Sequence, residues 1–189
     1  MKKLFLIAVL ATAAATLPVH AQDAAKKTAA VKPADSPSKV VLDSWNDIGR
    51  KITAMAEDFP EDKYDMKPTP AQRSFAEQLL HAAAANYYFT NIALGQKPPA
   101  DDNPKRDKYK TKADVVAFVK KSFADGAAAI QLKGDAGMSE LIVNPFDPQQ
   151  IRIGDWAYGF IEHDGEHYGQ LVVYYRVAGL VPPESRPKK

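Results

Sequence analysis

Four long segments with helical spacing of apolar residues constrain this chain more than any other feature. In each segment an apolar side chain recurs every three or four residues, which is the spacing of one face of an α-helix. The segments cover approximately residues 38–58, 71–94, 112–132 and 155–178. Helices of similar length bury such faces most simply against one another. The sequence therefore predicts an all-α protein, a four-helix bundle.

The ends of the predicted helices carry recognisable signals. Thr111 is a good N-cap for the third helix and Asp155 for the fourth, while Gly134 is expected to end the third. Only two runs resemble strands, ELIV at 140–143 and LVVYY at 171–175. Because the second lies inside a long helical pattern, we predict helix there and almost no sheet.

Two connections are too long to be simple turns. Residues 96–110 are polar and rich in proline, and residues 133–154 include the apolar runs SELIV and NPFDP. Connections of this length are often functional, so both are expected to cover a site. The first is also long enough to cross the bundle, so the second and third helices need not be antiparallel.

The first 21 residues have the form of a secretory signal peptide. Lys2 and Lys3 precede an apolar run at 4–17, and Val-His-Ala at 19–21 is a cleavage site, cut after Ala21. The apolar run is too short for a comfortable membrane span, and no second run of spanning length follows. We therefore expect a periplasmic or secreted protein, with no membrane attachment after removal of the signal.

The remaining sequence divides into three parts. Residues 22–37 are Ala, Lys, Pro and Ser with little else, which predicts a disordered linker. Residues 38–185 form the predicted domain, and residues 186–189 a short tail.

Charge and cysteine content exclude several classes of function. Without its first 21 residues the chain has 23 basic and 23 acidic side chains. Nucleic-acid-binding proteins usually carry a basic stripe, so no nucleic-acid partner is expected. The chain has no cysteine, which rules out disulfides, thiolate ligands, a cysteine nucleophile and a lipoprotein anchor.

Three histidines remain after removal of the signal: His81, His163 and His167. His163 and His167 are four residues apart and share one face of the fourth helix, and His81 lies in the middle of the second. Three neutral imidazoles can hold a divalent metal with an open coordination position, a pattern typical of a catalytic site. The alternative is that the three are core residues without a metal.

Further side chains share these helix faces. Glu77, Gln78, Glu166 and Gln170 are candidates to accept a hydrogen bond from an imidazole N–H. Glu166 is also the candidate general base, because HDGEH fits the H-x-x-E-H pattern of inverted zinc proteases. That pattern needs an acidic ligand further along the chain, where Glu184 is the sole carboxylate. The aromatic pocket candidates are Tyr88, Trp156, Phe160 and Tyr174, although a single aromatic residue of this kind is more often ordinary core.

Gly165 and Gly169 stand inside the fourth predicted helix, where each destabilises helix by roughly 1 kcal/mol relative to alanine. Either a close helix contact along this smooth stripe or an irregular segment would explain them.

Three stretches resemble motifs of the DinB-like family, also called YfiT-like or damage-inducible. HDGEHYGQLVVYYRVAGLVPPES at 163–185 is similar to its C-terminal signature. RSFAEQLLHAAAAN at 73–86 resembles its second helix, and residues 44–68 resemble its first helix and the following turn. Together the resemblance covers about residues 38–185.

The resemblance implies an up-down-down-up bundle with a long crossover between helices two and three. It also implies a divalent metal, whether zinc, nickel or iron, on His81, His163 and His167, and a possible homodimer. Some relatives are thiol-dependent transferases. Their thiols are cytosolic, whereas this chain carries an export signal, so thiol transfer is not inferred.

We therefore expect a metal-dependent enzyme that carries out transfer or hydrolysis on a small-molecule substrate. The metal would act as a Lewis acid or activate a bound water or thiol. The alternative is a non-catalytic periplasmic module that binds a metal or ligand.

Overall fold

Four helices dominate the structure, a computed structural model that describes residues 35–187. The predicted signal peptide and most of the predicted linker lie outside these residues. The helices are α1 (Pro37–Asp58), α2 (Phe75–Ala93), α3 (Lys112–Met138) and α4 (Ile153–Val177). Three short 3₁₀ helices and a two-stranded hairpin complete the described part: η1 (Glu61–Lys63), η2 (Arg106–Lys108), η3 (Pro183–Ser185), β1 (Leu141–Val143) and β2 (Gln150–Arg152). The predicted all-α four-helix bundle is confirmed.

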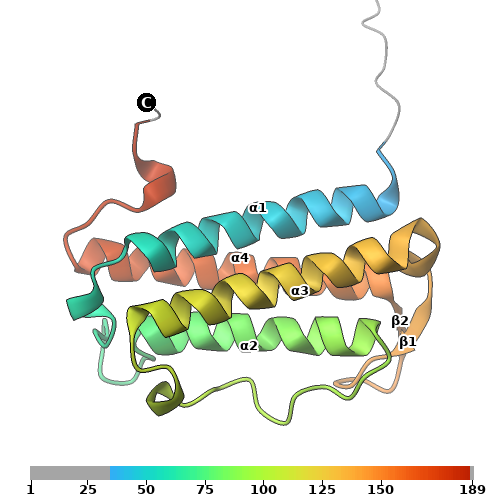
Figure 1. Ribbon diagram of the computed structural model, residues 1–189, viewed down its shortest axis with the longest axis horizontal. Helices are drawn as coiled ribbons and strands as arrows, with labels where there is room; N and C mark the ends of the chain where they lie inside the picture. Colours follow the sequence, from blue (N-terminus) through green and yellow to red (C-terminus); the bar gives the residue numbers. More distant parts are fainter. Residues whose placement is uncertain (1–34, 188–189) are drawn as a thin grey trace, which may run out of the picture. The chain divides into compact units, whose positions relative to one another are not determined.

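The helices have the up-down-down-up arrangement. In Figure 1, α1 and α4 run in one direction and α2 and α3 in the other. The segment between α2 and α3 crosses from one end of the bundle to the other, which allows these consecutive helices to be parallel. None of the described helices combines the length and the apolar character needed to cross a membrane.

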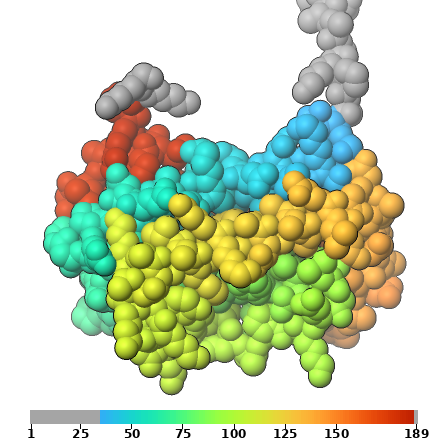
Figure 2. Space-filling model, viewed as in Figure 1, coloured from blue at the N-terminus to red at the C-terminus, as the bar shows by residue number. Residues whose placement is uncertain are grey.

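Close contact between α1 and α3 organises one part of the core. Trp45 of α1 is fully buried, its indole N–H donates to the carbonyl oxygen of Phe123 at 2.9 Å, and its ring lies 5.0 Å from that of Phe89. A Cβ atom on Gly126 would lie 2.1 Å from the Trp45 ring, so a side chain there is incompatible with this packing. Figure 2 shows the face of the bundle on which α3 lies, where the side chains of α3 fill the space between α1 and α2.

Two helices begin at different residues from those predicted. Helix α2 begins at Phe75 and not near residue 71, because Ser74 forms a capping box with Glu77. Helix α4 begins at Ile153, two residues before the predicted cap, so Asp155 lies in the first turn. A carboxylate is favourable there because the N-terminal end of a helix is electropositive.

Helix α3 follows its predicted start but not its predicted end. The Thr111 hydroxyl accepts a hydrogen bond from the amide of Asp114, which makes Thr111 the N-cap, as predicted. Gly134 does leave the helical conformation, at φ +57°, but helical structure resumes after this kink and continues to Met138.

The strands and the chain ends also refine the predictions. The run at 140–143 supplies β1, whereas its antiparallel partner β2 was not predicted, since three residues are too few to show alternation. Residues 171–175 are helical, as predicted. Helix α1 begins at Pro37, the last residue of the predicted linker. Arg186, the first residue of the predicted tail, donates a hydrogen bond to the Asp58 carboxylate and so contacts the domain.

Gly165 and Gly169 are exposed, and a Cβ atom on either would have no neighbour within 4 Å among the described residues. Of the two explanations offered for these glycines, a close helix contact is therefore absent within the described part of the single chain. Neither glycine adopts a left-handed conformation, so α4 continues through both.

Candidate metal centre

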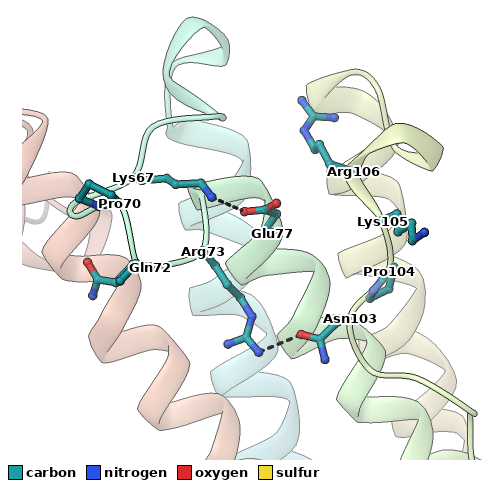
Figure 3. A pocket seen from close by; sticks show the side chains of 10 residues that line it. Lys67, Pro70, Gln72, Arg73, Glu77, Asn103, Pro104, Lys105 and Arg106 are labelled. Carbon is teal, nitrogen blue, oxygen red and sulfur yellow. Dashed lines mark hydrogen bonds and ion pairs between the residues drawn. The ribbon is translucent and has the colours of Figure 1, made fainter.

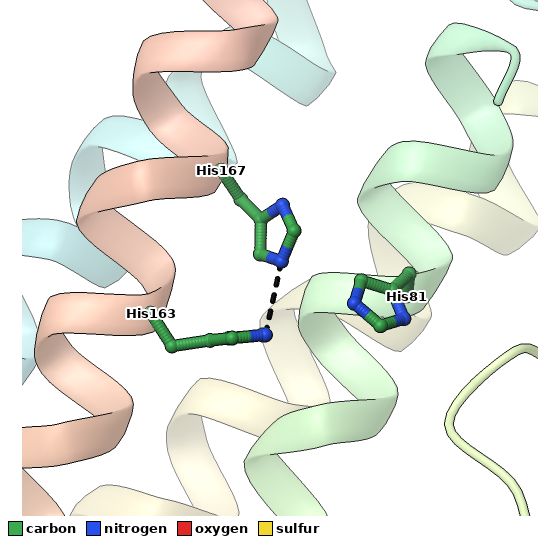
Figure 4. A group of neighbouring side chains, drawn as sticks. All are labelled: His81, His163 and His167. Carbon is green, nitrogen blue, oxygen red and sulfur yellow. Dashed lines mark hydrogen bonds between the residues drawn. The ribbon is translucent and has the colours of Figure 1, made fainter. Parts of the chain in front are cut away.

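His81 on α2 and the pair His163 and His167 on α4 point into one common space (Figure 4). One ring nitrogen from each lies within 4.8 Å of the other two, and Nε2 of His163 is 3.0 Å from Nε2 of His167. Nitrogens bound to one tetrahedral zinc ion at 2.0–2.1 Å would be ~3.3 Å apart. The spacing of the α4 pair matches a shared ion, and the three histidines could hold a metal.

Hydrogen bonds fix the orientation of the His167 ring. Its Nδ1 lies 3.2 Å from the side-chain oxygen of Gln170, and the amide nitrogen of Gln78 lies beside the same ring nitrogen. The Gln78 amide also donates to Gln170 at 2.6 Å. When Nδ1–H donates to Gln170, the lone pair of Nε2 faces the other histidines. The structure thus places Gln78 and Gln170 beside the centre, where the helix spacing predicted them.

The crossover between α2 and α3 fixes His81. Its Nδ1 donates to the main-chain oxygen of Asp102 at 3.1 Å, and the Asp102 carboxylate lies 3.6 Å away. This contact leaves Nε2 free to bind a metal. The crossover therefore covers the site, as expected from its length. The sequence did not single out Asp102, because an irregular loop has no periodicity to reveal which side chain points inward.

Burial keeps the three imidazoles neutral. It lowers the pKa of all three, and together with the charges of the neighbouring histidines it lowers the pKa of His163 and of His167 to about 4. The positive charge of Arg73 is one of the causes of the lowered pKa of all three histidines. Nδ1 of His163 is buried and has no hydrogen-bond partner among the described residues. At neutral pH the rings therefore offer lone pairs, the form that binds a metal.

An aromatic wall closes one side of the centre. The Phe160 ring lies 6.1 Å from the His163 ring and 5.0 Å from Trp156. Phe146, from the connection between α3 and α4, contacts both Trp156 and Tyr88, at 5.8 and 5.6 Å between ring centroids. The second long connection thus also lies over the predicted pocket residues.

A cavity of about 570 Å³ adjoins the other side, and Gln78, Gln170 and Tyr174 are among its lining residues. The Tyr174 hydroxyl donates to the main-chain oxygen of Arg73 at 2.6 Å, which ties α4 to the segment before α2. The polar and aromatic walls therefore lie on opposite sides of His167 along α4.

The structure does not bring three predicted carboxylates to the histidines. Glu77 caps α2 and lies 3.6 Å from Lys67. Glu166 is exposed and lies outside the group of converging ligand atoms. Glu184 pairs with Arg50 at 2.6 Å, so it does not act as the acidic ligand that the inverted-protease pattern requires.

One acidic residue beside the centre was missed. Asp164 follows His163 and is fully buried, and neither carboxylate oxygen makes a well-formed hydrogen bond with a described residue, although the Asn86 amide lies nearby. Burial raises the pKa of Asp164 well above its usual range. Its position four residues after Phe160 and seven before Leu171, on the buried stripe, was a usable signal.

Comparisons with known proteins agree with this fold. The family model of the DinB superfamily matches residues 47–171. A DinB-like protein from Bacillus cereus ATCC 10987 is 17% identical, with a TM-score of 0.66 over 77% of this chain and 95% of that chain. YfiT from Bacillus subtilis is 13% identical, with a TM-score of 0.62 over 79% and 93%. YfiT is described as a probable metal-dependent hydrolase with an unusual four-helix bundle topology.

No sequence among curated proteins matches the chain at a significant level. At these low identities the two solved structures establish the fold alone. The family model, in contrast, covers more than half of the sequence, from the middle of α1 to the second half of α4. The chain belongs to the DinB superfamily.

Proposed function

We propose that this protein is an exported metal-dependent enzyme that acts on a small molecule, with a divalent ion held by His81, His163 and His167. The convergence of three neutral imidazoles from α2 and α4 carries the proposal. The orientation of two of these rings by Gln170 and Asp102 supports it. The export signal in the first 21 residues supports a periplasmic or secreted location.

The donor set fits a catalytic ion better than a structural one. Three protein ligands leave at least one coordination position for water or substrate, whereas structural sites usually have four protein ligands. A bound divalent ion supplies Lewis acidity and lowers the pKa of a coordinated water or thiol. Zinc, nickel and iron are all compatible with imidazole ligands.

The protein's own residues prepare the site. Gln170 and Asp102 hold two imidazoles with Nδ1 protonated, so that Nε2 needs no rearrangement to bind. Phe160 and Trp156 exclude water from one side, and the cavity beside Gln78 gives room for a small substrate. We assign no role to Glu166, because it is exposed.

Hydrolysis is the favoured reaction. An exported protein has no access to the cytosolic thiols that transferases of this kind use, and the chain has no cysteine to replace them. Water is available in any compartment. The description of YfiT as a probable metal-dependent hydrolase points the same way.

Metal content and turnover test the proposal together. Wild type, His163→Ala and Glu162→Ala are purified and their metal content is measured; Glu162 is the exposed neighbour of His163 on α4. We expect about one ion per chain in wild type and Glu162→Ala, and loss of the ion in His163→Ala. Hydrolysis of chromogenic esters should disappear on chelation and return with metal.

Each component of the proposal can fail separately. Full metal content in His163→Ala would exclude the three-histidine site. A bound ion without turnover on any substrate class would favour the non-catalytic binding module. A periplasmic fraction in which the protein retains its first 21 residues by mass spectrometry would contradict cleavage after Ala21.

A further inference from the structure

A second hollow adjoins the cavity beside Gln78 and Gln170. It measures about 370 Å³ and lies between the N-terminal end of α2 and the crossover (Figure 3). The two hollows share three lining residues, Ala71, Gln72 and Arg73. Together they form one recess beside the histidines, with Arg73 at the junction.

Positive charge dominates the second hollow. Its lining includes four cationic side chains and one anionic one, which are Lys67, Arg73, Lys105, Arg106 and Glu77. Two of the cations are paired, Lys67 with Glu77 at 3.6 Å and Arg106 with Asp65 at 3.0 Å. Lys105 and Arg73 form no ion pair with any described residue. The recess therefore carries uncompensated positive charge.

Arg73 is held in place by a neutral partner. One guanidinium nitrogen donates to the side-chain oxygen of Asn103 at 2.8 Å, and this is the only side-chain hydrogen bond of Arg73 among the described residues. Figure 3 shows the side chain extended toward Asn103 across the hollow. Asp102 of the crossover faces His81, and no aspartate lines either hollow. The remaining guanidinium N–H groups are thus oriented but have no anion.

Arg73 also lies close to the metal centre. Its main-chain oxygen accepts the hydrogen bond from Tyr174, which lines the first cavity together with Gln78 and Gln170. A molecule of modest size in the recess would contact Arg73 at one end and lie beside the histidines at the other.

We propose that Arg73 binds a carboxylate or phosphate group of the substrate and thereby restricts the metal centre to anionic small molecules. A guanidinium matches the planar or tetrahedral oxygens of these groups with two parallel N–H donors, which a lysine cannot do. Asn103 fixes the fork before the ligand arrives, so less side-chain freedom is lost on binding. This inference rests on the proposed function, because the reacting end of the substrate is assigned to the histidine centre.

Inorganic phosphate, acetate and uncharged acetamide serve as probes, with binding measured by calorimetry on metal-loaded and on chelated protein. We compare wild type with Arg73→Gln and with Asn103→Asp, which places a competing carboxylate against an unchanged Arg73. The matched control is Arg176→Gln, an exposed arginine on α4. Metal content is measured in every sample, and circular dichroism checks folding.

We expect saturable binding of one or both anions and none of acetamide. Binding should weaken about tenfold in Arg73→Gln and in Asn103→Asp and stay unchanged in Arg176→Gln. The anion with the lower dissociation constant identifies the substrate group as carboxylate or phosphate. If Arg73→Gln does not fold, Asn103→Asp carries the test, because it changes only a crossover side chain.

Two results would overturn the proposal. One is the absence of saturable binding of either anion by wild type. The other is anion binding whose affinity is the same in wild type, Arg73→Gln and Asn103→Asp. If such binding also disappears on chelation, the anion binds to the metal and not to Arg73. A wild type without metal that still binds anions through Arg73 would instead refute the proposed metal-dependent function and leave the anion site standing.

Discussion

Nε2 of His163 and Nε2 of His167 lie 3.0 Å apart, so in the absence of a cation one of the two must donate its hydrogen to the other. Protonation of both rings to imidazolium would place two positive charges in a buried space. Burial is the main reason why both rings resist protonation, and the short distance prepares them to share an ion.

The metal-free protein should lose stability as the pH falls from about 6.5 to about 4. The pKa of His163 and of His167 is about 4 in the folded chain, below the ordinary value of about 6.5. Between these limits the unfolded chain binds more protons, so the contribution is complete above about pH 6.5 and is lost as the pH falls through 4. Urea unfolding of chelated protein across this range measures the effect. His163→Gln should show a shallower dependence, and an identical slope would contradict the assignment.

Gln170→Ala should weaken metal binding while leaving the fold intact. The Gln170 oxygen accepts hydrogen bonds from both His167 and Gln78, so its removal frees the ring to rotate. Loss of such an outer partner typically weakens metal affinity about 10- to 100-fold. Competition with a chromogenic chelator measures the affinity, and Glu162→Ala on the same helix is the control. Equal affinities in the two variants would show that the hydrogen bond does not orient the ligand.

Alanine at two helical glycines should have opposite effects on the free energy of unfolding. A Cβ atom on Gly126 would overlap the Trp45 ring, so Gly126→Ala should destabilise the protein by about 1–3 kcal/mol. Gly165 has no neighbour that a Cβ atom would meet, so Gly165→Ala should stabilise it by roughly 0.5–1 kcal/mol. Urea unfolding of the chelated proteins measures both. A concentration-dependent loss of stability in Gly165→Ala would instead reveal that a second copy of the chain packs on this face.

Asp164→Asn should stabilise the protein increasingly as the pH rises. Burial raises the pKa of Asp164 in the folded chain, so ionisation opposes folding only above the ordinary carboxyl pKa of about 3.9. An amide removes this penalty and can donate to the side-chain oxygen of Asn86, which has no hydrogen-bond partner among the described residues. The difference from wild type should be small near pH 4 and larger at neutral pH. Glu162→Gln, an exposed change, should show no such trend.

The sequence predicted the parts of the fold in which the same spacing of apolar residues recurs over several helical turns. Apolar spacing is sampled five or six times in each long segment, so the helices were identified although their ends moved by up to six residues. Spacing also brought His163, His167 and Gln170 to one face of α4. In contrast, β2 has three residues and no repeat to detect.

Loop contacts around the centre were beyond prediction for a different reason. Asp102 reaches His81, and Arg73 lines the adjoining cavity, only because the crossover and the segment before α2 fold back on the bundle. The positions of these segments depend on contacts such as Arg73 with Asn103, which are 30 residues apart in the sequence. Glu77 was misplaced although its signal was present, since Ser-x-x-Glu is the pattern of a capping box.

The three histidines come from α2 and α4 alone, whereas the tight glycine contact with Trp45 joins α1 and α3. The ligands and this tight contact thus lie on different pairs of helices, although the pairs meet in the core, where Trp45 packs on Phe89 of α2. A change at Trp45 or Gly126 can therefore affect the ligand atoms through such core contacts, but not through a shared helix.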